Sequence, residues 1–304
     1  MERDDVLGSN RVAADGTVGS VKLVAEIGGN HLGEMEIARR LIGAAAACQH
    51  VHIAKFQKRN PRALLSQEQY NSPHPNPEHS FGKTYGAHRE FLEFDLDQHR
   101  QLKAWCEKSG IEYSVSVWDI TSAREIVTLN PAMVKVPSAC NLNFEILDYL
   151  CRYYEGKIHI SLGMTTKSEE LSILRNLADH GRTRDVVLYA CTSAYPTPFE
   201  DACLREIDRL ISAYGDDVHA VGFSGHHVGI ALDIAALTLG AAYIERHFTL
   251  DRGFKGTDHA ASLEPDEFGK LARDLVAVDA ALTLKPSDIL PVEIPACEKL
   301  KIRA

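Results

Sequence analysis

The 304-residue sequence has no excess of positive charge, no long apolar run and no CxxC cysteine pair. Its 33 lysines and arginines against 42 acidic residues give a formal net charge of −9, so we expect no general attraction to nucleic acid or to an anionic membrane. No apolar run reaches the roughly 18 residues that a membrane span needs, and residues 1–5 lack the apolar core of a signal peptide. The seven cysteines are an odd number, which predicts free thiols in a cytoplasmic protein.

The sequence also lacks a GxGxxG motif after its first apolar segment, which argues against the open sheet of a dinucleotide-binding fold. Short, continuously apolar segments alternate instead with stretches of helical periodicity. Such segments are typical of strands covered on both faces, and about eight of these units predict a single-domain α/β protein with the (β/α)8 TIM barrel fold. The predicted strands span residues 21–27, 51–57, 111–117, 132–136, 157–162, 185–191, 218–223 and 242–247.

The predicted barrel takes up most of the chain. We assign residues 21–285 to a TIM-barrel catalytic domain, residues 1–20 to a polar leader, and residues 286–304 to a tail too short to form a domain. One connection, residues 58–94, interrupts the regular alternation and is rich in proline, histidine and asparagine. A connection of this length is more often a functional lid than a passive linker, so a lid is predicted here.

Polar residues gather at the carboxyl ends of the predicted strands, where barrel enzymes place their chemistry. Glu26 is the most informative of them, because a carboxylate within an apolar strand is costly unless it is paired or functional. If the strands close into a barrel, all of these side chains converge on one mouth. They are Glu26, Lys55, Gln57, Ser116, Lys135, Ser138, Ser161, Ser193, Tyr195, Ser224, His226, His247 and Asp258.

These residue types support three kinds of chemistry. Lys55 and Lys135, together with the serine hydroxyls, can hold a phosphate or carboxylate by charge-assisted hydrogen bonds. His226 and His247 offer two neutral imidazoles to a divalent metal and leave its other positions open. The carboxylates and Tyr195 remain to position hydroxyls or to move protons. Together they indicate carbon–carbon bond formation between an anionic phosphate ester and a carbonyl compound.

Six segments of the sequence resemble the motifs of the sialic acid synthase (N-acetylneuraminate synthase) family. The resemblance runs in order from about residue 21 to residue 300, and its later part is most similar to the animal enzymes. The segments are residues 25–31 (AEIGGNH), 55–57 (KFQ), 191–196 (CTSAYP), 222–226 (GFSGH), 245–248 (ERHF) and 255–262 (KGTDHAAS).

The resemblance implies a cytoplasmic, homodimeric transferase that condenses phosphoenolpyruvate with an aldose. The acceptor would be N-acetylmannosamine or a related sugar, with or without a phosphate, and the products a sialic-acid-type 3-deoxy-2-keto sugar acid and inorganic phosphate. It also implies a divalent metal, Mn²⁺ before Mg²⁺ or Co²⁺, bound by His226 and His247. The implied catalytic residues are Glu26, Lys55, Lys135, Tyr195 and Asp258, and the implied substrate-binding residues are Gln57, Ser116, Ser138, Cys140, Ser161, Ser193 and Ser224.

Two departures from the family pattern bear on the acceptor. Cys140 stands where the family has a carboxylate facing the sugar, and as a thiol it is either a substrate contact or a packed small residue. The sequence also stops without the family's antifreeze-like C-terminal domain, which supplies an arginine to the N-acyl group. Either the 58–94 connection, with Lys83, His88 and Arg89, completes the pocket, or the acceptor differs. Within that connection, Lys58, Arg59 and Arg89 serve either a phosphorylated acceptor or a solvated loop face.

Two further hypotheses compete with the leading one. A sibling phosphoenolpyruvate-dependent synthase would use a pentose or tetrose phosphate as acceptor. A non-catalytic barrel, kept as a binding or scaffold subunit, would have no organised metal site and would lose little when His226 or His247 is replaced.

Overall fold

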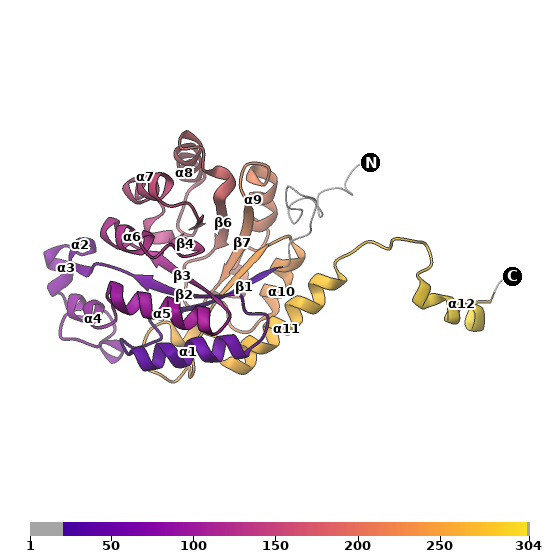
Figure 1. The fold of residues 1–304 in the computed structure, drawn as a ribbon, viewed down its shortest axis with the longest axis horizontal. Helices are drawn as coiled ribbons and strands as arrows, with labels where there is room; N and C mark the ends of the chain where they lie inside the picture. Colours follow the sequence, from indigo (N-terminus) through magenta and orange to yellow (C-terminus); the bar gives the residue numbers. More distant parts are fainter. Residues whose placement is uncertain (1–20, 303–304) are drawn as a thin grey trace.

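A closed, parallel eight-stranded barrel forms the centre of the protein, as seen in the computed structural model, which describes residues 21–302 (Figure 1). Each strand pairs with its neighbours in sequence order, and β8 pairs with β1 to close the barrel. The predicted (β/α)8 TIM barrel is therefore confirmed. The strands are β1 (Lys22–Gly28), β2 (Ile53–Lys58), β3 (Glu112–Val117), β4 (Met133–Val136), β5 (Lys157–Ser161), β6 (Val186–Cys191), β7 (Ala220–Gly225) and β8 (Tyr243–His247).

Helices follow the strands one by one and cover the outside of the barrel, with apolar stripes turned toward it (Figure 1). Among the described residues, none of the helices is long and apolar enough to span a membrane. The helices of the outer layer are α1 (Met35–Ala47), α5 (Leu96–Lys108), α6 (Ile120–Val127), α7 (Phe144–Tyr153), α8 (Lys167–Asp179), α9 (Glu206–Tyr214), α10 (Ala231–Thr238) and α11 (Pro265–Ala281).

The connection between β2 and α5 is folded into three short helices, α2 (Pro61–Leu64), α3 (Gln67–Asn71) and α4 (Tyr85–Phe91). Side-chain caps explain why they begin where they do. Asn60, Ser66 and Thr84 each accept hydrogen bonds from backbone N–H groups of the first turn that follows. The predicted lid is thus an ordered part of the barrel's carboxyl end.

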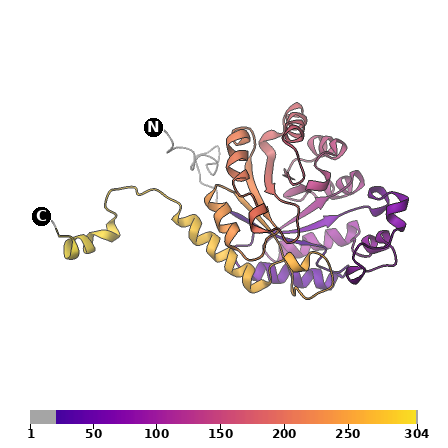
Figure 2. The same cartoon turned by 180° about the vertical axis from the view of Figure 1, so that it is seen from behind.

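The described part of the chain begins at β1 and ends beyond the barrel. Residues 1–20, the predicted leader, and residues 303–304 lie outside the described residues. After α11 ends at Ala281, the chain leads away from the barrel to the short helix α12 (Ile294–Leu300), as both views show (Figures 1 and 2). Neither end approaches the mouth of the barrel in the part of the chain that is described.

Strand register brings the polar residues together. Glu26 lies beside Lys55 on β2 and beside His247 on β8, while Ser116 on β3 lies beside Lys135 on β4. Because side chains alternate along a strand, the residues two positions earlier also point into the barrel. There Val24, Ile53 and Met133 form a small apolar layer below the polar one.

Candidate active site

A cavity of about 520 Å³ opens at the carboxyl ends of the strands. Every strand contributes to its wall, and the connection between β2 and α5 forms part of its rim. Of the predicted site residues, all except Cys140 line it. The predicted residues in the wall are Glu26, Lys55, Gln57, Ser116, Lys135, Ser138, Ser161, Ser193, Tyr195, Ser224, His226, His247 and Asp258.

Two lysines and two glutamates form a buried network at the floor of the cavity. Lys55 is ion-paired with Glu26, and its Nζ lies 3.5 Å from Glu245 Oε1 and donates to Ser116 Oγ at 2.8 Å. Lys135 Nζ lies 2.9 Å from Glu245 Oε2. Glu245 therefore bridges the two ammonium groups inside the barrel.

The network shifts the pKa values of its members. Burial opposes the charge on Lys55, but Glu245 and Glu26 outweigh it and raise the pKa of that lysine. Burial and the nearby Lys55 charge instead lower the pKa of Lys135, although Glu245 acts in the other direction. Burial opposes ionisation of Glu245, yet the two lysines hold its pKa well below the ordinary value. The network thus favours the ammonium form of Lys55 more than that of Lys135.

Sequence reasoning missed two residues that contact Lys135. Glu245 is one of them, and the other is Tyr189, whose ring centroid lies 3.6 Å from Lys135 Nζ in a cation–π contact. The Tyr189 hydroxyl is hydrogen-bonded to His159 Nδ1 at 2.9 Å, inside the barrel. Period-2 alternation places both on inward-facing positions, since Glu245 lies two residues before His247 and Tyr189 two residues before Cys191, but it does not show that they meet Lys135.

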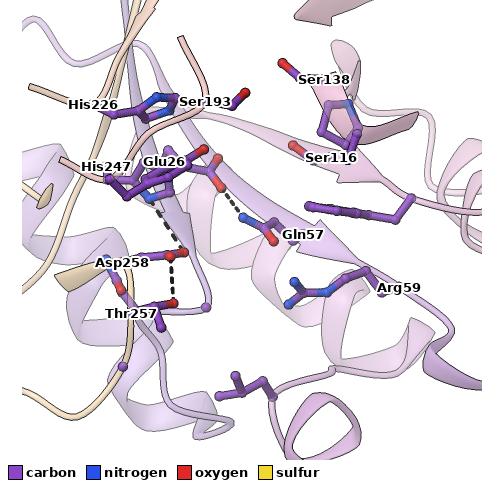
Figure 3. Close-up of a pocket in the computed structure, with 18 of the residues that line it drawn as sticks. Glu26, Gln57, Arg59, Ser116, Ser138, Ser193, His226, His247, Thr257 and Asp258 are labelled. Carbon is purple, nitrogen blue, oxygen red and sulfur yellow. Dashed lines mark hydrogen bonds and ion pairs between the residues drawn. The ribbon is translucent and has the colours of Figure 1, made fainter. Parts of the chain in front are cut away.

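Two imidazoles lie near each other in the cavity wall (Figure 3). The ring centroids of His226 and His247 are 5.6 Å apart, and the Tyr195 ring lies 4.1 Å from the His226 ring. Asp258 completes this side, with its Oδ2 3.9 Å from His247 Nδ1 and its Oδ1 accepting from Thr257 Oγ1. Figure 3 shows His226, His247 and Asp258 around the carboxylate of Glu26.

The histidine pair fits a divalent metal with open coordination positions. His226 Nδ1 is hydrogen-bonded to the Thr192 carbonyl at 2.9 Å, which leaves Nε2 with a free lone pair. Burial, together with His247, lowers the pKa of His226 to about 3, so this imidazole is neutral. His247 Nδ1 is buried and has no hydrogen-bond partner among the described residues. No cluster of three or more His, Cys, Asp or Glu side chains within residues 21–302 is arranged to hold a metal, so water and substrate would complete the coordination.

Serine hydroxyls also line the cavity. Ser138 Oγ accepts a hydrogen bond from the Gly163 N–H at 3.0 Å, and Ser193 lies close to the same glycine. A Cβ atom at Gly163 would lie 2.5 Å from Ser193 Oγ and 2.8 Å from Ser138 Oγ. Only glycine allows both hydroxyls to approach there, which keeps them in the cavity wall.

The rim carries two arginines that sequence analysis left open. Arg59 is buried, its Nε lies 2.5 Å from Glu93 Oε1, and its guanidinium lies over the Trp118 ring. Arg89 donates to the Tyr85 hydroxyl, and burial, followed by the Arg59 charge, lowers its pKa. Both line the cavity, so a solvated loop face is the wrong description of them.

The remaining cations of this connection do not reach the cavity. Lys58 Nζ lies 3.1 Å from Glu125 Oε2, and Lys83 is exposed; neither is among the residues that line the wall. His88 lies in the wall, and burial, followed by His74, lowers its pKa to about 4. Arg59, Arg89, His74 and His88 are therefore the basic groups that the connection gives to the rim.

Cys140 does not face the cavity. It is buried, and its Sγ lies 3.2 Å from the Trp118 carbonyl oxygen as a hydrogen-bond donor. Ser138, Ala139 and Cys140 form a single 3-10 turn, in which successive side chains point about 120° apart. Ser138 and Ala139 line the cavity while Cys140 turns behind it, so the structure does not support its prediction as a substrate contact.

Comparisons with known proteins agree with this geometry. Residues 41–286 match the NeuB family. N-acetylneuraminate-9-phosphate synthase of Homo sapiens and that of Mus musculus are each 37% identical over 281 residues, which cover 91% of this chain and 76% of theirs. N,N'-diacetyllegionaminic acid synthase of Campylobacter jejuni is 31% identical and is covered over 77% of its length, against 86% of this chain.

Solved structures give the same result. The N-acetylneuraminic acid (sialic acid) synthetase of Leptospira borgpetersenii, crystallised with citrate, has a TM-score of 0.78 and 25% identity, and 94% of each chain is covered. The 3-deoxy-D-arabino-heptulosonate 7-phosphate synthase of Thermotoga maritima, at 15% identity and a TM-score of 0.63, shares the fold alone. The predicted resemblance is confirmed, as is the prediction of a sialic acid synthase-like transferase: this chain belongs to the NeuB family.

Proposed function

We propose that the protein condenses phosphoenolpyruvate with a phosphorylated, N-acetylmannosamine-like aldose in a reaction that depends on a divalent metal. The products are a 3-deoxy-2-keto sugar acid phosphate and inorganic phosphate. One observation carries this proposal: two buried ammonium groups and two imidazoles line a single cavity. The name of the mammalian relatives, N-acetylneuraminate-9-phosphate synthase, supports a phosphorylated product.

The lysine side of the cavity is suited to phosphoenolpyruvate. This substrate carries a carboxylate and a phosphate ester on the same carbon, C2, and both groups accept charge-assisted hydrogen bonds. Lys55 and Lys135 provide the positive charge, and serine hydroxyls provide further donors. Glu245 and Tyr189 fix the direction of Lys135 before the substrate arrives, which lowers the cost of binding. The hydroxyl donors are those of Ser116, Ser138, Ser161, Ser193 and Ser224.

The histidine side is suited to the aldehyde end of the acceptor. His226 and His247 would hold the divalent metal, for which we propose Mn²⁺. When bound, it supplies Lewis acidity at the aldehyde oxygen and an ordered water. Tyr195 covers the His226 ring, and Gln57 donates to Glu26 Oε1 at 2.8 Å, so both are directed toward the same space. These side chains orient the acceptor hydroxyls near C1.

The reaction follows from this arrangement. C3 of phosphoenolpyruvate attacks the aldehyde carbon to form the new carbon–carbon bond, and C2 becomes an oxocarbenium centre. A water oxygen adds to C2 and gives its proton to the carboxylate of Glu26 or Asp258, both of which lie beside His247. The aldehyde oxygen takes up that proton. The C2 hydroxyl then gives its own proton to the departing phosphate as the C2–O bond to phosphate breaks, which leaves a ketone at C2. Fixing both reactants in one cavity supplies about 7 kcal/mol or more of the barrier.

The rim explains why a phosphorylated acceptor is preferred in this proposal. Arg89 forms no ion pair with a carboxylate among the described residues, and it lies in the cavity wall near Arg59. An acceptor whose aldehyde carbon lies at the histidines extends its other end toward this rim. A phosphate there would meet the Arg89 guanidinium, which suits bidentate recognition of phosphate.

The test measures phosphate release from phosphoenolpyruvate and Mn²⁺ with matched acceptors. We expect turnover with N-acetylmannosamine 6-phosphate, weaker turnover with the unphosphorylated sugar, and loss of both with a metal chelator. The same assay with a pentose phosphate or a tetrose phosphate as acceptor tests the sibling-synthase alternative. No phosphate release above background with any N-acylated aldose would contradict the proposal.

A further inference from the structure

A buried cluster outside the cavity joins β8 to the chain that follows β7. Arg246 alternates with Glu245 and His247, so its side chain points out of the barrel, toward the helices. It is fully buried, as are its partners Asp233, on α10, and His227. None of the three lines the cavity.

Arg246 binds this chain segment at several points. Its Nη1 is paired with Asp233 Oδ2 and donates to the Gly229 carbonyl at 2.8 Å, while its Nη2 donates to the His227 carbonyl at 2.6 Å. The His227 ring also joins the cluster, with Nε2 3.0 Å from Arg246 Nη1 and 3.4 Å from Asp233 Oδ2. One guanidinium thus fixes the whole turn between β7 and α10.

A contribution to folding stability does not by itself explain why this cluster is present. A buried ion pair often contributes no more than apolar packing of similar volume, because both charges lose their hydration. Asp233 Oδ1 and Arg246 Nε also lack hydrogen-bond partners among the described residues, so the pair is not fully compensated. Its position is the informative feature: Arg246 directly precedes His247, and it binds the carbonyl of the residue directly after His226.

We propose that Arg246 and Asp233 are positioning residues that set the separation of the His226 and His247 rings, and thereby the affinity for a divalent cation. The inference rests on the metal site of the proposed function. The two rings, 5.6 Å apart, stand on separate strands, and Arg246 is bonded to the chain next to both of them. Loss of the guanidinium would free the turn after His226 from β8, and the imidazoles would no longer be held in register.

The test is direct titration of the full chain with Mn²⁺ alone, with free Mn²⁺ measured by electron paramagnetic resonance. Residues that orient metal ligands typically change metal affinity by about 10- to 100-fold when replaced. We expect a loss of this size in Arg246→Lys, which keeps the charge but has too few donors for all of its acceptors. Asp233→Asn, which keeps the shape, should lose less.

Arg182 offers a matched control. Its guanidinium also pairs with one aspartate, Asp185, and also donates to backbone carbonyls, those of Cys151, Tyr154 and Gly156. It lies before β6, at the opposite end of the barrel from the cavity. Arg182→Lys should lower the thermal midpoint as Arg246→Lys does, and leave the Mn²⁺ dissociation constant unchanged.

The possible results distinguish a failure of the positioning inference from a failure of the proposed metal site. Wild-type Mn²⁺ affinity in Arg246→Lys would overturn the inference, and so would an equal loss of affinity in Arg182→Lys, because general loosening would then explain both. If Arg246→Lys does not fold, Asp233→Asn decides by the same criterion. If the wild-type chain binds no Mn²⁺, the metal site of the proposed function fails, which differs from a positioning failure.

Discussion

The inside of the barrel has two layers that differ in kind although they are built on the same strands. In the lower layer, Val24, Ile53 and Met133 pack against one another and are almost completely buried. In the layer above, the residues two positions further along, Glu26, Lys55 and Lys135, are just as buried but carry charge. Barrel interiors are normally filled by apolar side chains, so the upper layer is the exception.

The difference shows that the lower layer serves mainly the stability of the barrel and the upper layer mainly its chemistry. Burying a charge is unfavourable unless partners compensate it, and the upper layer is compensated by ion pairs within itself. Its lysines also keep free donors toward the cavity for an anion. The apolar layer below excludes water from one side of this network and strengthens every interaction in it. Substitutions in the two layers should therefore separate activity from folding.

The largest effect on activity is expected at the imidazoles. His226→Ala removes one of the two protein ligands of the proposed metal and should reduce Mn²⁺-dependent turnover by about 10³-fold or more. Phosphate release under saturating substrates measures it, with circular dichroism as a control for folding. Turnover at the wild-type rate would exclude a metal role for this residue.

A smaller effect is expected in the charged layer. Lys135→Ala removes a charge-assisted contact to phosphoenolpyruvate and should raise its KM by about 10- to 100-fold, with a smaller change in kcat. Initial rates at varied phosphoenolpyruvate give both constants. An unchanged KM would show that this ammonium group does not contact the substrate.

The rim should discriminate between acceptors. Arg89→Met should raise the KM of a phosphorylated acceptor by about 10-fold and leave that of the unphosphorylated sugar unchanged, because only the first meets the guanidinium. Arg62 is the control: it belongs to the same connection, pairs with Glu90 and lies outside the cavity wall. Equal effects of Arg89→Met on both acceptors would contradict a phosphate contact.

A substitution in the lower layer should reduce stability and leave the chemistry unchanged. Ile53→Ala, two residues before Lys55 on the same face of β2, leaves a cavity in packed surroundings and should cost about 2–5 kcal/mol of unfolding free energy. Both KM values should remain near wild type at a temperature where the variant is folded. Denaturant unfolding measures the loss of stability, and initial rates measure the two KM values. A change in KM as large as that of Lys135→Ala would abolish the distinction between the layers.

The smallest effect is expected at Cys140. Burial, followed by the Asp119 charge, raises the pKa of its thiol to about 11, so at pH 8 the group is protonated and unreactive. A short iodoacetamide pulse should modify the exposed Cys203 first, as peptide mass spectrometry would report. Cys140→Ala should keep both KM values. A raised acceptor KM would restore Cys140 as a substrate contact.

The sequence allowed a prediction of the barrel because its parallel strands are continuously apolar, and of most of the cavity wall because the polar residues follow those strands. Glu245 and Tyr189 were missed as site residues since they lie within the barrel, where only strand register shows that they meet Lys135. Cys140 was left between a substrate contact and a packed small residue, because the sequence does not show that the 3-10 turn of residues 138–140 directs its side chain behind the cavity wall. Arg89 was left open because its position depends on how α4 packs on the rim.

An anomalous-difference map at the manganese absorption edge tests the central claim most directly. The crystal would contain the full chain, soaked with Mn²⁺ and phosphoenolpyruvate. The account predicts one strong peak within coordination distance of His226 and His247, and phosphoenolpyruvate density against Lys55 and Lys135. A peak elsewhere, or ordered phosphoenolpyruvate away from both lysines, would contradict it.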